Sequence, residues 1–254
     1  LSYNVHIFGH ADTRHWDENE CVRYINECDA DIACLQECVI ARVDVALDLL
    51  KEKYPYQDLR NYKGNYLVML SKYPILSTQH IEFKSKSNRS YAYEVLVDDD
   101  PIVVINNHLE SYHLQPKDKK QYKELIKNPE NDNTLTKFFS LSRKLKKATA
   151  KRGPQADSVA AFIKKNKGRY SISCGDFNDA SLSYTHKRLT EDLNDAFTRS
   201  GCGFGISYHK SGMYFRIDNI LCSPNITPYG AEVDNSISVS DHYPITAYLS
   251  LGER

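Results

Sequence analysis

The sequence lacks a charge imbalance and long apolar runs, and each absence narrows what the chain can be. Its 33 lysines and arginines match its 33 aspartates and glutamates. This balance argues against a dedicated nucleic-acid or membrane binder, because such proteins usually carry a basic excess, although a local basic patch can serve the same purpose. No stretch reaches the roughly 18 consecutive apolar residues that a membrane-spanning helix requires.

The sequence also lacks an ordered set of cysteines. Its seven cysteines are odd in number and scattered. Cys34 and Cys38 are further apart than the cysteines of the usual zinc knuckle, and no Cys/His pair follows at a matching distance. We therefore expect free, mostly buried thiols that pack as small apolar side chains.

The chain has no recognisable signal peptide, and its first residue is Leu1 rather than methionine. Since Leu1 already lies in a strand-like segment, we expect that the natural protein continues upstream. That upstream segment is a candidate for export or membrane anchoring, so the localisation stays open. We expect the chain itself to be a soluble monomer without an obligate protein partner.

Strand and helix patterns alternate along the 254 residues. Alternating or continuous apolar runs predict strands at 1–8, 31–37, 66–70, 76–83, 91–97, 101–109, 170–174, 214–221, around 231–233 and at 243–249. Helical periodicity and capping signals predict helices at 17–28, 42–53, 134–150 and 155–165, with an interruption at Gly153–Pro154. The polar segment 111–133 predicts a lid-like connection with a short helix. Without repeats or linkers, one α/β domain spanning 1–254 is the simplest account.

Polar side chains gather at the ends of the predicted strands. These residues are Asn4, Glu37, His108, Asp176, Asn178, Asp218, Asp241 and His242. The strand ends of α/β sheets are where ligand sites form, although each residue alone has an ordinary structural explanation. Asp218 is harder to explain because it lies among Ile217, Ile220 and Leu221, where an unpaired carboxylate is costly. His242 is its natural partner.

Six short strings carry a family resemblance when they are taken in chain order. They are Ser-Tyr-Asn-Val, Leu-Gln-Glu, Asn-His-Leu-Glu-Ser, Gly-Asp-Phe-Asn, Arg-Ile-Asp and Ser-Asp-His-Tyr-Pro. Together they resemble the endonuclease/exonuclease/phosphatase superfamily, which includes apurinic endonucleases, neutral sphingomyelinases and tyrosyl-DNA phosphodiesterases. The polar segment 111–157 resembles a bacterial branch of it. The resemblance implies a four-layer sandwich in which two central mixed β-sheets are flanked by helices.

The resemblance also implies a phosphoesterase that depends on Mg²⁺, or on Mn²⁺. In such an enzyme a metal-organised water attacks the phosphate directly, without a covalent intermediate. Glu37 is expected to be the principal metal ligand because hard oxygen donors suit Mg²⁺. Asn4 is expected beside it, and Asp241 is expected to contact the ion directly or through water.

The remaining site residues are predicted to handle the proton and the phosphate charge. Asp176 is expected to orient and deprotonate the attacking water, and Asn178 to hold Asp176 or a phosphate oxygen. His242, oriented by Asp218, is expected to stabilise the developing negative charge, and His108 to donate to the phosphate or leaving group. The Asp218–His242 pair is an alternative general base.

The substrate is less well determined by the sequence. Arg89 and Arg216 are candidates for substrate contact, but structural ion pairs explain them equally well. The basic helix at 143–152 is expected to be a solvated face, with a rim for an anionic substrate as the sharper alternative. Nucleic acid, phospholipid headgroups and sugar phosphates all fit the same chemistry. Two rival hypotheses are a non-catalytic anion-binding module on the same fold and a hydrolase with a Cys or Ser nucleophile.

Overall fold

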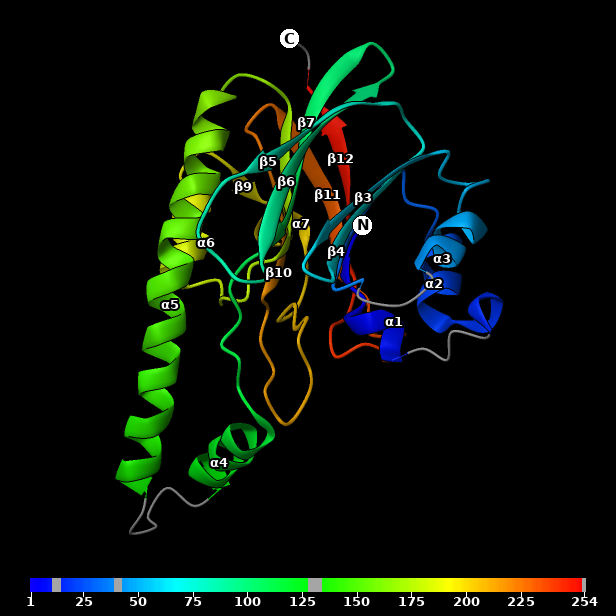
Figure 1. The fold of residues 1–254 in the computed structure, drawn as a ribbon. Helices are drawn as coiled ribbons and strands as arrows, with labels where there is room; N and C mark the ends of the chain where they lie inside the picture. The colour runs from blue at the N-terminus through cyan, green and yellow to red at the C-terminus, as the bar shows by residue number, and fades with distance from the viewer. Residues whose placement is uncertain (11–14, 39–42, 128–133, 253–254) are drawn as a thin grey trace.

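The computed structural model describes residues 1–10, 15–38, 43–127 and 134–252. Two six-stranded mixed sheets pack face to face, with helices on their outer faces (Figure 1). The first sheet has the order β11 (Ile226–Val233), β12 (Ile245–Leu251), β1 (Ser2–Asn4), β2 (Ile32–Gln36), β4 (Asn65–Ser71) and β3 (Tyr56–Tyr62). The second has β5 (Ile75–Ile81), β6 (Arg89–Val97), β7 (Asp100–His108), β8 (Ser171–Asp176), β10 (Asp218–Cys222) and β9 (Asn194–Asp195). The predicted sandwich is confirmed.

Apolar side chains fill the interfaces between the layers. Met69, Val104 and Ile220 belong to the cluster between the two sheets. The first sheet is covered by α2 (Glu20–Cys28) and α3 (Val43–Leu49), and the second by α5 (Thr134–Lys165). All seven cysteines are free, and five of them are buried, as the sequence predicted.

The shorter helical elements lie around the strand ends. They are α1 (His6–His10), the 3₁₀ turn η1 (Trp16–Glu18), α4 (Pro116–Lys127), α6 (Tyr184–Leu189) and α7 (Ala196–Ser200). Across the described ranges, none of the helices combines the length and the apolar character that crossing a bilayer demands. Two predicted segments extend outside the described residues, namely the start of the helix at 42–53 and the end of the polar segment at 128–133.

The helix α5 is continuous where the sequence predicted a break at Gly153–Pro154. A proline inside a helix removes a hydrogen bond and costs about 3 kcal/mol. Its neighbours offset this cost, because Val159 and Ile163 pack into the core against the second sheet. The prediction of two helices was wrong because tertiary packing overrides the local preference.

The first half of α5 extends beyond the sheets, and α4 lies beside it (Figure 1). We call residues 116–127 and 134–152 the helical hairpin. Lys144 Nζ donates to Asp118 Oδ1 at 2.6 Å and thereby joins the two helices. The hairpin belongs to the connection between the parallel neighbours β7 and β8, which need a long crossover in any case.

Two predicted strands are shorter than expected. The strand predicted at 1–8 ends at Asn4, and Ile7, Phe8 and Gly9 follow with φ angles of 58°, 50° and 69°. This left-handed turn buries Phe8 against Trp16, with ring centroids 5.2 Å apart. The strand predicted at 214–221 begins only at Asp218, because Phe215 pairs with Tyr208 in an isolated bridge.

Candidate active site

Strand register brings the predicted site residues of the second sheet together. His108 pairs with Asp176 between β7 and β8, and Asp218 pairs with Asp176 between β10 and β8. Gly175 precedes Asp176 with φ of 128°, and a Cβ atom there would lie 2.1 Å from the carbonyl oxygen of Asn107. Only glycine allows β7 and β8 to approach so closely at this point.

Asp176 is the centre of the hydrogen-bond network. Its Oδ2 accepts from Asn4 Nδ2 at 3.0 Å and from Asn178 Nδ2 at 2.9 Å. Its Oδ1 accepts from the backbone N–H of Asn178 at 2.8 Å. Asn4 comes from the first sheet and Asp176 from the second, so this contact fixes the two sheets to each other at the site. The carboxylate is 1% exposed and its orientation is fully determined.

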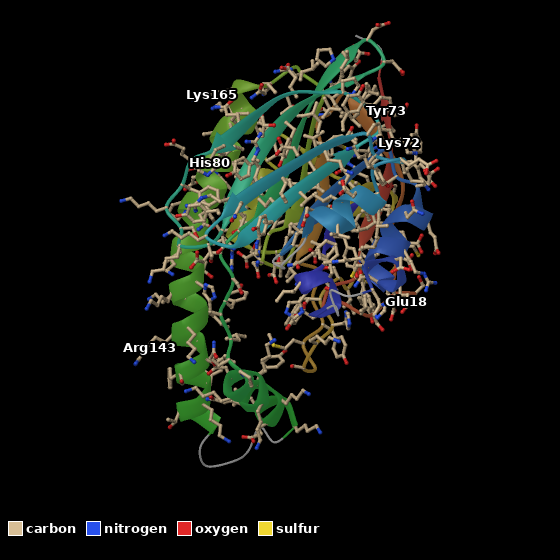
Figure 2. The ribbon with its side chains drawn as sticks, turned by 45° about the vertical axis from the view of Figure 1, so that its right-hand side comes forward. Glu18, Lys72, Tyr73, His80, Arg143 and Lys165 are labelled. Carbon is tan, nitrogen blue, oxygen red and sulfur yellow. The ribbon has the colours of Figure 1, made fainter. Side chains whose placement is uncertain are left out.

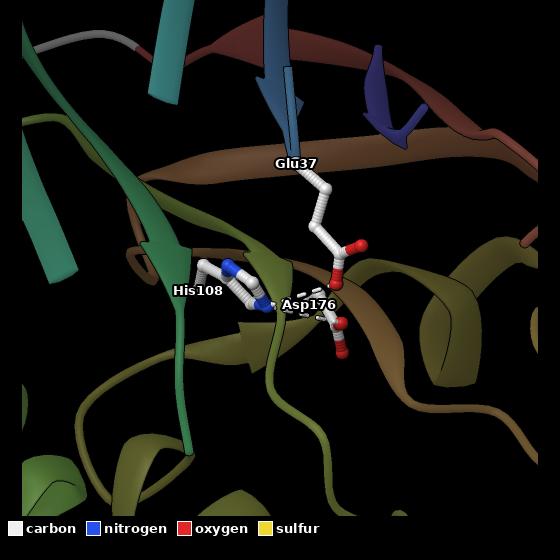
Figure 3. Close-up of side chains that lie close together, drawn as sticks. All are labelled: Glu37, His108 and Asp176. Carbon is white, nitrogen blue, oxygen red and sulfur yellow. Dashed lines mark ion pairs between the residues drawn. The ribbon is translucent and has the colours of Figure 1, made fainter. Parts of the chain in front are cut away.

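Glu37 reaches the same point from the end of β2, as Figure 3 shows. His108 Nε2 lies 3.3 Å from Glu37 Oε1 and 3.9 Å from Asp176 Oδ2. Glu37 has a φ of 54°, an uncommon conformation for a residue with a side chain. Such backbone strain is typical of functional sites, where the surrounding structure holds it in place.

The imidazole of His242 completes the group on the opposite side. Its Nδ1 lies 2.7 Å from Asp218 Oδ2, and its Nε2 lies 3.9 Å from Asp176 Oδ2. The backbone N–H of His242 donates to Ser240 Oγ, which in turn donates to the carbonyl of Asn4 at 2.7 Å. Asp218 therefore fixes the ring, and the free side of the ring faces the carboxylate of Asp176.

Burial and neighbouring charges set the protonation of these groups. Burial raises the pKa of Asp176 to about 6, helped by the charges of Asp218 and Glu37 and opposed by those of the two histidines. Burial also acts to raise the pKa of Glu37, but the hydrogen bond and charge of His108 outweigh it and lower that pKa to about 2. A carboxyl group with a pKa near neutrality suits a general base.

The pKa values of the two histidines are both raised. Burial disfavours a charge on His108, but Glu37 outweighs it and raises the pKa. Burial likewise disfavours a charge on His242, but Asp218 and Asp176 raise its pKa well above the ordinary value. The neighbouring carboxylates therefore make both rings easier to protonate than a free imidazole, and a protonated ring can donate to an anion.

The carboxylate oxygens of the site suit a hard divalent cation, whereas an imidazole that holds a proton on both nitrogens has no lone pair for one. Ligand atoms of Glu37, His108 and Asp176 lie within 4.8 Å of one another, and those of Asp176, Asp218 and His242 do the same. Glu37, Asp176 and Asp241 line one pocket. The side chain of Glu37 is 30% exposed. Mg²⁺ prefers one or two carboxylates and keeps several waters, which this partly open set of oxygen atoms allows.

Asp241 lies at the pocket but outside both clusters of the described residues. Its Oδ1 lies 3.1 Å from His6 Nδ1. The backbone N–H of His6 donates to Asn4 Oδ1 at 3.1 Å, so His6 connects these two predicted metal contacts. His6 is not recognisable as a site residue from the sequence, because its position depends on the left-handed turn that follows β1.

The two candidate arginines lie elsewhere. Arg89 is buried, donates to the carbonyl of Asn88 at 2.6 Å and stacks on Tyr62. Arg216 binds Asp195 with both Nη atoms, at 3.1 and 2.7 Å. Neither residue lines the pocket that contains Asp176. Their contacts are those of structural residues, which is one of the two explanations that the sequence left open for them.

A second group of side chains holds the helical hairpin near this site. Arg152 is fully buried, and its Nε lies 3.1 Å from Asp179 Oδ2. Tyr112 donates to Asp179 Oδ1 at 2.7 Å, and its ring lies 4.3 Å from the guanidinium of Arg152. Sequence reasoning missed these roles, although Asp179 directly follows Gly-Asp-Phe-Asn and Arg152 opens the string Arg-Gly-Pro-Gln-Ala-Asp.

Comparisons with known proteins agree with this geometry. The sequence model of the Endonuclease/Exonuclease/phosphatase family matches residues 1–242. No curated protein matches the sequence. Truncated TDP2 of Caenorhabditis elegans is similar in structure, with a TM-score of 0.65 and 20% identity, over 97% of this chain and 94% of that chain.

Two further solved structures cover nearly the whole chain. The mannosyl-6-phosphatase of Bacteroides thetaiotaomicron has a TM-score of 0.66 and 16% identity, over 98% of both chains. TDP2 of D. rerio, complexed with a single-strand DNA product, has a TM-score of 0.65 and 16% identity, over 98% of this chain and 97% of that chain. At these identities, the likeness shows a shared fold.

Proposed function

Because the chain belongs to the endonuclease/exonuclease/phosphatase family, we propose that it hydrolyses a phosphate ester with a water that Mg²⁺ organises. One observation carries this proposal. A buried carboxylate, Asp176, lies 3.9 Å from both His108 and His242, and Glu37 lies beside His108. This arrangement offers a base and two cationic donors around one point, which is what attack on an anionic phosphate requires.

The proton transfer is assigned to Asp176. Its two oxygens are fixed by Asn4 and Asn178, so the carboxylate accepts a proton from water without reorienting. The raised pKa makes it a stronger base than an ordinary carboxylate. Asp218 and His242 form the alternative base, since their 2.7 Å contact also gives an oriented imidazole.

The phosphate is held by the charged donors of the site. Protonated His242 and His108 donate to the phosphate oxygens and stabilise the charge that develops in the transition state. Glu37 is the proposed principal ligand of Mg²⁺, with Asn4 and Asp241 in support. When bound, Mg²⁺ acts as a Lewis acid on a phosphate oxygen and lowers the pKa of a coordinated water.

The similar structures support a phosphate ester as the substrate. TDP2 of D. rerio was crystallised with a single-strand DNA product, and the Bacteroides thetaiotaomicron protein is a mannosyl-6-phosphatase. Proteins of this fold thus act on a nucleic acid in one case and on a sugar phosphate in another. The proposed catalytic centre is compatible with a nucleic acid and with a sugar phosphate, because its residues are proposed to contact only the phosphate group.

Hydrolysis of bis-p-nitrophenyl phosphate with and without Mg²⁺ tests the proposal. We expect activity that EDTA removes and Mg²⁺ restores. Asp176→Asn and Glu37→Ala should each lower kcat by about 10³-fold, the range of a lost general base or metal ligand. Asp99→Asn, an exposed carboxylate in the β6–β7 turn, is the matched control and should leave kcat unchanged.

A different result would favour the rival hypothesis of a binding module. If calorimetry detected phosphate binding without metal dependence, and a panel of phosphoesters showed no turnover by the folded protein, the proposed function would be wrong. Inactivation by alkylating reagents would instead point to a cysteine nucleophile.

A further inference from the structure

The catalytic centre opens into a cavity of about 350 Å³ that the helical hairpin covers. The polar end of this cavity is formed by Glu37, Asp176, Asn178, Asp241 and His242. The rest is formed by the segment 111–115, the hairpin and the segment around 208–217. The volume lies near the lower end of the range for small-molecule sites, about 300–1,000 Å³.

The part of the cavity away from the catalytic centre is mostly apolar. Its lining includes Leu114, Tyr122, Leu141, Leu145, Met213 and Phe215. The hairpin supplies three of these side chains, and the 208–217 segment supplies two. An ester bound with its phosphate at Asp176 therefore places the rest of the molecule against apolar and aromatic side chains.

The positively charged side chain of Lys119 lines this cavity. Lys119 Nζ donates to Tyr208 Oη at 2.7 Å, and the Tyr208 ring packs edge-on against His242 with centroids 5.2 Å apart. Among the described residues, no carboxylate lies within ion-pair distance of Lys119. Lys119 thus adds positive charge close to the point where an anionic ester enters.

The covering hairpin is anchored rather than loosely attached. Buried Arg152 holds Asp179 in the loop after β8, and Tyr112 also donates to Asp179. Lys144 and Asp118 join the two helices of the hairpin. The cavity therefore has a fixed size, so the group that occupies it must match its volume and its apolar lining.

We propose that this cavity selects phosphate esters of a compact alcohol with an apolar or aromatic face, rather than internal phosphodiesters of a nucleic acid. Leu145 on the hairpin sets the size of the accepted group, and Lys119 attracts its phosphate. This inference rests on the proposed function and adds the substrate class. A nucleic-acid strand would have to lie across the opening of the cavity. It would leave the apolar lining empty and so would not gain the free energy of burying an apolar group there.

The test compares two esters and two variants. In the presence of Mg²⁺, kcat/KM is measured for bis-p-nitrophenyl phosphate and for a 5′-labelled single-stranded oligonucleotide, and each variant is compared with the wild type on the same ester, so that the better nitrophenolate leaving group cancels. Leu145→Trp fills the cavity and should raise KM for the aryl ester about tenfold, with kcat and the oligonucleotide rate little changed. Ala150→Trp adds the same bulk on the exposed side of the same helix and should change neither.

Circular dichroism melting identifies any variant that fails to fold. For such a variant, the less bulky Leu145→Phe replaces Leu145→Trp in the comparison. If the oligonucleotide is the better substrate, or if neither Leu145 variant raises KM for the aryl ester, the inference is wrong while the proposed function stands. If Mg²⁺ supports no hydrolysis of any ester, the proposed function is wrong and the inference falls with it.

Discussion

The helical hairpin and the two-sheet body differ in charge as much as in architecture. The hairpin residues 116–127 and 134–152 contain 12 lysines and arginines against 2 aspartates and glutamates, a net charge of +10, so the rest of the neutral chain carries −10. The acidic body contains Glu37, Asp176 and Asp241, and the basic hairpin covers the cavity that these carboxylates line. The net charge of zero therefore hides an uneven distribution of charge along the chain. A basic hairpin beside the cavity suits an anionic substrate.

The two regions also use their charges differently. In the body, Asp195 is nearly buried and is held by Arg216 and His186, with the His186 Nε2 atom 2.9 Å away. In the hairpin, Arg143, Lys146 and Lys147 are exposed on α5. Figure 2 shows Arg143 on the side of α5 turned away from α4. Asp195 thus has a structural partner inside the body, whereas these three hairpin charges face solvent. We therefore expect their substitutions to affect different measurements.

The largest effect is expected at the junction of the two regions. Arg152→Met leaves Asp179 as a buried carboxylate without its partner, and breaking such a pair costs about 3–5 kcal/mol. The melting temperature should fall by roughly 10 °C, given 2–4 °C per kcal/mol in a chain of this size. Differential scanning calorimetry measures this shift.

Arg143→Met on the exposed face of the same helix is the matched control for this substitution. It should change stability by less than about 0.5 kcal/mol. Equal melting temperatures for the two variants would mean that Arg152 does not anchor the hairpin.

A smaller effect, with a definite pH dependence, is expected inside the body. Burial acts to raise the pKa of Asp195, but hydrogen bonds from His186 and Arg216 outweigh it and lower that pKa. Asp195 therefore stabilises the fold above the ordinary carboxyl pKa of about 3.9, and this contribution is lost as the pH falls toward the lowered value.

Urea unfolding of the wild type and of Asp195→Asn measures this contribution. We expect the wild type to be more stable by about 2 kcal/mol at pH 6, and the difference to shrink between pH 4 and pH 2. A difference that grows on acidification would contradict the assignment. Asp192→Asn is a suitable control, because its partner Lys167 is exposed and such pairs contribute little.

The smallest effect is expected on the outer face of the hairpin. Replacing Arg143, Lys146 and Lys147 together with glutamine should lower kcat/KM for an anionic ester several-fold at low ionic strength. The difference should vanish near 0.5 M salt, because salt screens exposed charges. Steady-state kinetics across a salt series measures it.

The same change in net charge elsewhere gives the control for this comparison. Lys51, Lys63 and Lys164 are exposed residues outside the hairpin, and their joint replacement with glutamine should have a smaller effect on kcat/KM. If the two triple variants behave alike, net charge matters and the location of the charge does not.

Local patterns predicted one α/β domain with polar residues gathered at its strand ends, and the resemblance of six short strings to a known family implied the sandwich. Asn4 interrupts the first predicted strand, Glu37, His108 and Asp176 end or follow apolar runs, and His242 precedes the last strand; ligand sites of α/β sheets form at such strand ends. Their roles in catalysis stay predictions. The strand register that places His108 beside Asp176 was not available from the sequence.

The hairpin was predicted least well. Its residues were read as a lid-like connection and two separate helices, because Gly153–Pro154 is a local signal for a break. The buried contact between Arg152 and Asp179 joins residues 27 positions apart, and no pattern in either segment announces it. Tertiary contacts of this kind decide the course of α5 and the shape of the cavity, so the sequence alone did not reveal them.

The crossover between β7 and β8 has one more consequence. These strands are parallel neighbours, and the segment between them leaves the sheet just after His108 and returns at Ser171. Only the outer part of this segment, residues 116–151, is open to exchange as a unit, because Arg152 binds Asp179 and Val159 and Ile163 pack into the core. A chimaera with a foreign hairpin should keep the polar site at the strand ends and bind a different set of esters.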